Sequence, residues 1–236
     1  MGEQPALRKG GLAAPELADV ALVAGLWVVS DVGYYWLFPA LGLSASYGAH
    51  PVWSALYYAA WIPIALIALR RQFRTWAPFA EPARLAIVVP VLALLFLVFA
   101  LYAPSLLPSV VWTESWPAPD ILLADPWYFL PKSVDILFQQ LLIVALVLAL
   151  ASREHDLRRI AMACGVLFGV AHLLLAFGGL PSMYVIRFTL FATLFGLLFP
   201  WLILKVRNGF VWSYSLHWIY YAATLITAHT VSPYVR

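Results

Sequence analysis

The chain is dominated by apolar runs that are each about as long as a bilayer is thick. A helix needs roughly 20 apolar residues to cross the hydrocarbon core, and the first such run continues to about Leu43. Because 64% of the residues are hydrophobic and 11% are charged, too little polar surface remains for a water-soluble domain. We predict an all-α polytopic transmembrane bundle of about seven spans in one domain, residues 1–236. The later runs occupy residues 52–69, 85–107, 133–151, 160–180, 183–204 and 210–231.

The distribution of basic residues predicts an orientation, because positively charged loops stay on the cytoplasmic side. With the N-terminus inside, the outer segments hold Lys132, Arg187 and Arg236. The inner segments hold Arg8, Lys9, Arg70, Arg71, Arg74, Arg84, Arg153, Arg158, Arg159, Lys205 and Arg207. We therefore predict an N-in, C-out topology. Since the basic residues are dispersed as loop flanks, we expect the lipid bilayer as a partner and no nucleic acid.

Residues 106–131 interrupt the pattern with a segment rich in proline, tryptophan and acidic residues. Its aromatic residues Trp112, Trp116, Trp127 and Tyr128 suit the headgroup layer of a membrane. We interpret the segment as an outer loop that packs over helix ends.

Polar residues inside the predicted spans are candidate functional residues, because ionisable groups in hydrocarbon are costly and face the interior of a bundle. They are Asp31, Asp135, Gln139, Gln140, His172, Arg187 and His217. We predict that Gln139, Gln140, His172 and His217 meet in one buried polar pocket. Two histidines on separate helices could hold a metal ion. Alternatively, each histidine bonds a backbone carbonyl or a tyrosine.

The residues around the two histidines resemble the CAAX-protease and bacteriocin-processing (CPBP) family of intramembrane metalloproteases. Phe168 precedes His172 by four residues, and a turn with Asn208 and Gly209 leads into His217. The family pattern is Glu-Glu-x-x-x-Arg on one helix, Phe-x-x-x-His on the next and His-x-x-x-Asn on a later one. The chain matches the second motif, and it matches the third with Tyr221 where asparagine is usual.

The resemblance covers about residues 131–225 and implies a CPBP-like core in the C-terminal four helices. Residues 18–130 then form three N-terminal helices and the outer loop. Together with the short loops and the charge pattern, the resemblance also implies a prokaryotic cytoplasmic (inner) membrane.

The first family motif is absent from this chain. Gln139 and Gln140 stand where the family has its two glutamates, and Val144 stands where it has arginine. A glutamine side chain cannot take up a proton near neutral pH, and it is a poor zinc ligand. We therefore predict a catalytically inactive relative without a cofactor. Zinc on His172 and His217 belongs to the alternative in which the protein is active.

Two acids could in principle replace the missing glutamates. Asp135 precedes Gln139 by one helical turn, and Asp31 lies mid-helix. For both we favour a structural role, paired with Arg187 or bonded to tyrosine. The function we expect is that of a binding, scaffolding or accessory subunit for other membrane proteins. The alternatives are an active metal-dependent peptidase, and a carrier or assembly factor for a lipophilic ligand or pigment.

Overall fold

The computed structural model describes residues 15–74, 76–113, 118–154, 156–173, 175–176 and 182–231. Its α-helices are α1 (Pro15–Ala40), α2 (Pro51–Ala68), α3 (Arg70–Phe73), α4 (Pro82–Leu106), α5 (Phe129–Ala151), α6 (Leu157–Leu173), α7 (Ser182–Lys205) and α8 (Gly209–Val231). Two short 3-10 helices, η1 (Asp120–Leu123) and η2 (Pro126–Tyr128), precede α5. No β-strand element occurs within these ranges, which confirms the all-α prediction.

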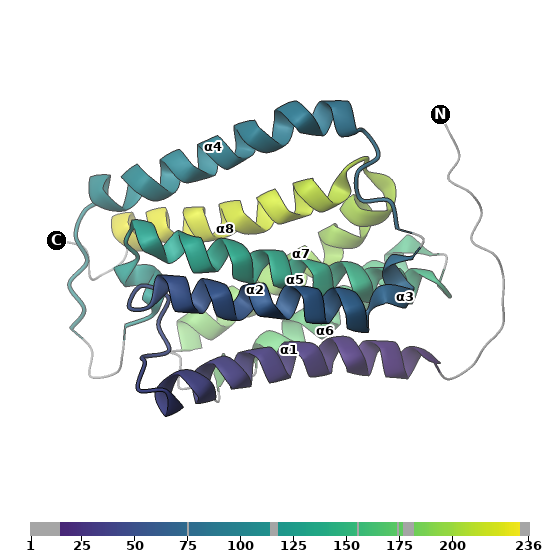
Figure 1. Cartoon of the computed structure of the whole chain (residues 1–236), viewed down its shortest axis with the longest axis horizontal. Helices are drawn as coiled ribbons and strands as arrows, with labels where there is room; N and C mark the ends of the chain where they lie inside the picture. The colour runs from purple at the N-terminus through teal and green to yellow at the C-terminus, as the bar shows by residue number, and fades with distance from the viewer. Residues whose placement is uncertain are drawn as a thin grey trace.

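The long helices alternate in direction along one axis (Figure 1). α1 begins at one end of the bundle, and α8 finishes at the opposite end (Figure 1). α4 lies at the edge, whereas α5 lies among the other helices. One end of the bundle, which we call the basic end, is where α2 finishes, α4 begins, α5 joins α6, and α7 joins α8.

Within the described residues, five helices are long and apolar enough to cross a membrane. These spans cover residues 18–40, 51–68, 82–106, 126–151 and 182–205. Of the other two long helices, α6 has 17 residues, and α8 carries several buried polar side chains. The span that contains α5 begins at Pro126 instead of residue 133, because η2 runs directly into the helix. The run predicted over residues 160–180 is helical from Leu157 to Leu173 and then leaves α-helical geometry.

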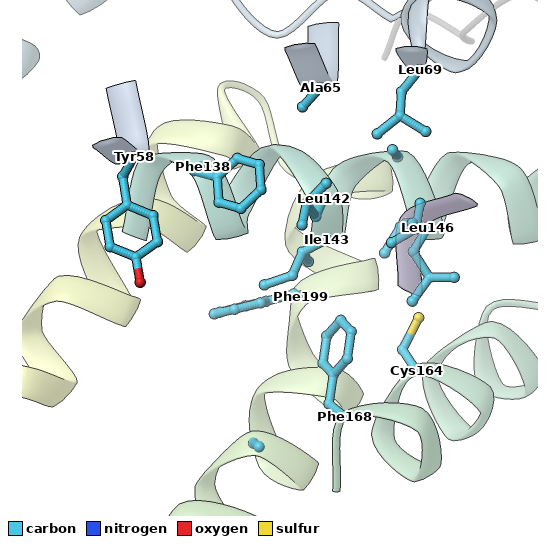
Figure 2. Packing of buried hydrophobic residues seen from close by; sticks show 14 of the residues in the cluster. Tyr58, Ala65, Leu69, Phe138, Leu142, Ile143, Leu146, Cys164, Phe168 and Phe199 are labelled. Carbon is cyan, nitrogen blue, oxygen red and sulfur yellow. The ribbon is translucent and has the colours of Figure 1, made fainter. Parts of the chain in front are cut away.

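α5 forms the centre of the packing because its C-terminal half, residues 141–151, is apolar on every side. In an 18-residue stretch of its span, 72% of the residues are buried, compared with 11–28% in the corresponding stretches of the other four spans. Tyr58 from α2 approaches α5 from one side, and Phe168 from α6 and Phe199 from α7 approach from the other (Figure 2). The first two helices therefore share one core with the C-terminal helices.

Small residues bring α6 and α7 into close contact. A Cβ atom added to Gly196 would lie 2.6 Å from the Cys164 carbonyl oxygen and from backbone atoms of Gly165. A Cβ atom on Gly165 would lie 3.1 Å from Leu197. The small residues thus allow the two backbones to approach directly, as in other membrane helix pairs.

The turn between α7 and α8 depends on Asn208 and on Gly209, the first residue of α8. Asn208 has a left-handed backbone with φ of 56°. A Cβ atom on Gly209 would overlap the carbonyl oxygen of Leu202. The Asn208 side-chain oxygen also accepts a hydrogen bond from the Glu81 backbone N–H at 3.2 Å, which fixes the start of α4 to this turn.

We predict that Gly196→Ala destabilises the protein by about 1–3 kcal/mol, because the new methyl group must force α6 and α7 apart. Gly25→Ala is the matched control, since a Cβ atom at Gly25 meets nothing within 4 Å. The control should be neutral or stabilising by up to about 1 kcal/mol. Thermal unfolding midpoints in detergent measure both changes, and equal midpoints for the two variants would contradict the close helix contact.

Candidate functional site

Five of the residues selected from the sequence line one cavity, which we call the histidine pocket: Gln139, Phe168, His172, His217 and Tyr221. The remaining lining is aromatic or aliphatic and consists of Trp27, Ile143, Phe188, Ala192, Phe195, Phe199 and Tyr220. The volume of about 30 Å³ accommodates one or two water molecules. α1, α5, α6, α7 and α8 all contribute, so the pocket forms where these helices meet.

Gln140 does not line the histidine pocket, contrary to the prediction that it would. Its side chain is fully buried, and its Nε2 donates to Ser213 Oγ on α8 at 2.6 Å. Its Oε1 has no hydrogen-bond partner among the described residues. Consecutive residues on a helix point about 100° apart, and here Gln139 faces the pocket whereas Gln140 faces Ser213. The two glutamines therefore do not act as a pair.

His172 lies in the last turn of α6, which ends at Leu173, although the predicted span continued to residue 180. Its Nδ1 lies 2.8 Å from the Phe168 carbonyl oxygen and donates a hydrogen bond to it. That bond fixes the neutral tautomer, with Nε2 left as the acceptor. Phe168 thus supplies the carbonyl that orients the histidine.

His217 is buried in aromatic surroundings on α8. Its ring stacks on Tyr221 at a centroid distance of 5.7 Å and packs against Phe195 at 5.7 Å. Its Nδ1 is buried and has no hydrogen-bond partner in the described part of the chain. A neutral imidazole with an unsatisfied ring nitrogen is therefore directed into the core.

Asp135 is held by three donors. Lys132 Nζ lies 2.8 Å from Oδ2, Tyr47 OH donates to Oδ2 at 3.0 Å, and Gln139 Nε2 donates to Oδ1 at 2.8 Å. Burial raises the pKa of Tyr47, with the nearby Asp135 carboxylate adding to the shift, so the phenol stays protonated and donates. Gln139 is thereby fixed by Asp135, and its carbonyl oxygen remains as its acceptor toward the pocket.

Lys132 is buried in the first turn of α5, whereas the charge pattern predicted that it flanks an outer loop. Besides its ion pair with Asp135, its ammonium group lies 4.0 Å from the centre of the Tyr221 ring and 5.2 Å from that of Tyr47. Tyr221 therefore has the lysine on its ring and His217 stacked against it. The three-residue spacing of Lys132 and Asp135 was the sequence signal for this pair.

Asp31 does not pair with Arg187, which was one of the two structural partners predicted for it. Arg187 Nη2 instead donates to Thr224 Oγ1 on α8 at 3.1 Å. Asp31 is half-buried on α1, within electrostatic range of Lys132 and Asp135. It is therefore a neighbour of the buried ion pair and does not line the histidine pocket.

Comparisons with protein-family models, with curated proteins and with solved structures find no match to the chain. The chemistry of the histidine pocket therefore rests on its own geometry. Among the described residues, no group of three or more histidine, cysteine or acidic side chains is placed to hold a metal ion. Two neutral imidazoles and one amide oxygen do not fit the usual tetrahedral zinc site, which has three or four strong ligands.

We predict that Lys132→Met lowers stability by about 3–5 kcal/mol, because it leaves the buried Asp135 carboxylate without its cation. The double variant Lys132→Met/Asp135→Leu removes both charges and should recover most of that loss. Thermal unfolding of the two variants in detergent checks this. A double variant that is less stable than Lys132→Met would contradict the pairing.

Proposed function

We propose that the chain is a membrane-embedded, non-catalytic relative of the CPBP proteases, which acts as a binding, scaffolding or accessory subunit of a membrane complex. The observation that carries the proposal is the state of Asp135. Its carboxylate accepts a hydrogen bond from Gln139, which lines the histidine pocket. The same carboxylate is also bound by Lys132 and Tyr47. The acid best placed to replace the missing glutamates is thus engaged in a structural network.

Peptide hydrolysis at this pocket needs a base to activate water and a positive group to polarise the carbonyl. Gln139 cannot serve as the base. A divalent ion held by His172 and His217 alone would keep its full charge in a low-dielectric site, which is costly. The buried ammonium of Lys132 adds repulsion. These points favour the non-catalytic subunit over a metal-dependent peptidase that uses Asp135 or Asp31.

The outer surface of the bundle supports a role in contacts within the bilayer. The spans of α1 and α2 are each 17% buried, and that of α4 is 11% buried. Their exposed side chains are apolar or aromatic, including Trp36 and Trp53. Such surfaces suit lipid and other membrane helices. The carrier alternative would require the histidine pocket to expand from about 30 Å³ toward the roughly 300–1,000 Å³ of typical ligand sites.

The proposal includes seven spans, N-in and C-out, in a prokaryotic inner membrane. The alternating helices of Figure 1 favour an odd number of crossings. The connections at the basic end carry most of the described arginines, which favours that end as the inner one. α6 and α8 would then cross together with the five more apolar helices.

We expect Leu123→Cys in η1 to be labelled by an impermeant maleimide in intact cells, and Ser152→Cys and Phe79→Cys to be labelled only after permeabilisation. The native Cys164 is buried and can be replaced by alanine in the background. All three positions are exposed. Labelling of Leu123→Cys and Ser152→Cys from the same side would contradict the topology.

We predict that the purified protein holds less than one tightly bound zinc per chain and does not cleave peptides, because the pocket lacks charge compensation for the ion. Elemental analysis and a peptide-release assay measure these properties, with His172→Ala as the matched control. The variant Gln139→Glu, at the glutamine that lines the pocket, should raise zinc affinity if the pocket keeps its geometry. About one zinc per wild-type chain, lost in His172→Ala, would show an intact metal site and refute the proposal.

A further inference from the structure

The basic end of the bundle carries a surface whose charges are only partly neutralised. Its exposed basic side chains are those of Arg70, Arg71, Arg74, Arg84, Arg153, Arg158, Arg159, Lys205 and Arg207. Glu81 engages Arg207 at 2.6 Å and Arg84 at 3.4 Å. Hydrogen bonds and ion pairs from these arginines hold the pKa of Glu81 below its usual range, so it stays ionised. Glu81 therefore neutralises part of the charge of Arg207 and Arg84.

Arg70, Arg71 and Arg74 lie close together on this surface, in and just after α3. None of the three makes an ion pair or side-chain hydrogen bond with another described residue. Arg70 and Arg74 are four residues apart, so they project from the same side of the chain as it leaves α2. The three guanidinium groups are therefore free to bind an anion outside the chain.

The segment that presents these arginines is firmly anchored. Leu69, just before them, is completely buried in the core. Phe73 packs on Trp76 at a centroid distance of 5.6 Å, and Trp76 packs on Phe210 of α8 at 5.4 Å. The arginines thus project from a fixed turn at the end of a span, where Figure 1 shows α3 following α2.

We propose that Arg70, Arg71 and Arg74 form a binding site for the headgroup phosphate of an anionic phospholipid. Guanidinium groups match phosphate oxygens with paired hydrogen bonds. Basic clusters at the end of a membrane helix attract anionic lipids. Trp76, which packs on Phe73 of the same segment, is a residue type of the membrane interface. This setting favours a lipid over an acidic protein surface, and the site is independent of the function proposed for the histidine pocket.

The test titrates the purified full-length protein in neutral detergent with phosphatidylglycerol or phosphatidylcholine and counts retained lipid by native mass spectrometry. We expect the wild type to prefer phosphatidylglycerol by about tenfold, with the preference falling as salt rises. The triple variant Arg70→Gln/Arg71→Gln/Arg74→Gln should lose the preference. Because these side chains are exposed and unpaired, the variant keeps the wild-type fold.

The matched control removes the same charge from the same end: Arg153→Gln/Arg158→Gln/Lys205→Gln should retain the preference. An equal loss in both triple variants would show that net charge alone attracts the lipid and would overturn the site. Equal retention of the two lipids by the wild type would overturn it as well and leave an acidic protein surface as the partner. Release of the lipid by millimolar inorganic phosphate would assign the arginines to free phosphate instead of a lipid.

Discussion

The buried ion pair between Lys132 and Asp135 determines the chemistry of the polar centre of this protein. Each charge would be unstable in an apolar core without the other. Once paired, they fix Tyr47 and Gln139 through hydrogen bonds, and they place the ammonium group on the ring of Tyr221. The same ring stacks on His217. A carboxylate that could have served a reaction in the histidine pocket thus belongs to a network that joins the start of α5 to α8 and to the loop before α2.

The pocket and the fold depend on the same helix. α5 is buried on nearly every side, so its polar residues bond one another and neighbouring segments. Asp135 and Gln139, one turn apart, face the pocket region, whereas Gln140 turns toward Ser213. The α7–α8 turn, with the left-handed Asn208, then sets the start of α8 and with it the position of His217. The site is therefore a result of how α5 is enclosed.

Much of this fold was predictable from the sequence, because apolar periodicity and length identify helices directly. The helices near residues 52–69, 85–107, 183–204 and 210–231 occur close to their predicted bounds. The meeting of Gln139, His172 and His217 followed from the rule that polar residues in a membrane bundle face inward.

The errors came from tertiary contacts that a sequence does not specify. Lys132 was taken as a loop charge, and Gln140 as a partner of Gln139 in the pocket. His229 is held by a tertiary contact of the same kind, because it is buried and its Nδ1 bonds the Pro108 carbonyl oxygen at 2.8 Å. His155 lies outside the described residues.

A high-resolution density map of the purified protein in a lipid nanodisc tests the proposal of a non-catalytic pocket most directly. We expect continuous density between the Lys132 ammonium and the Asp135 carboxylate, and between His172 and His217 no feature stronger than ordered water. A metal-strength peak bonded by both histidines, with Asp135 turned away from Lys132 toward that peak, would contradict the non-catalytic pocket and restore the peptidase alternative.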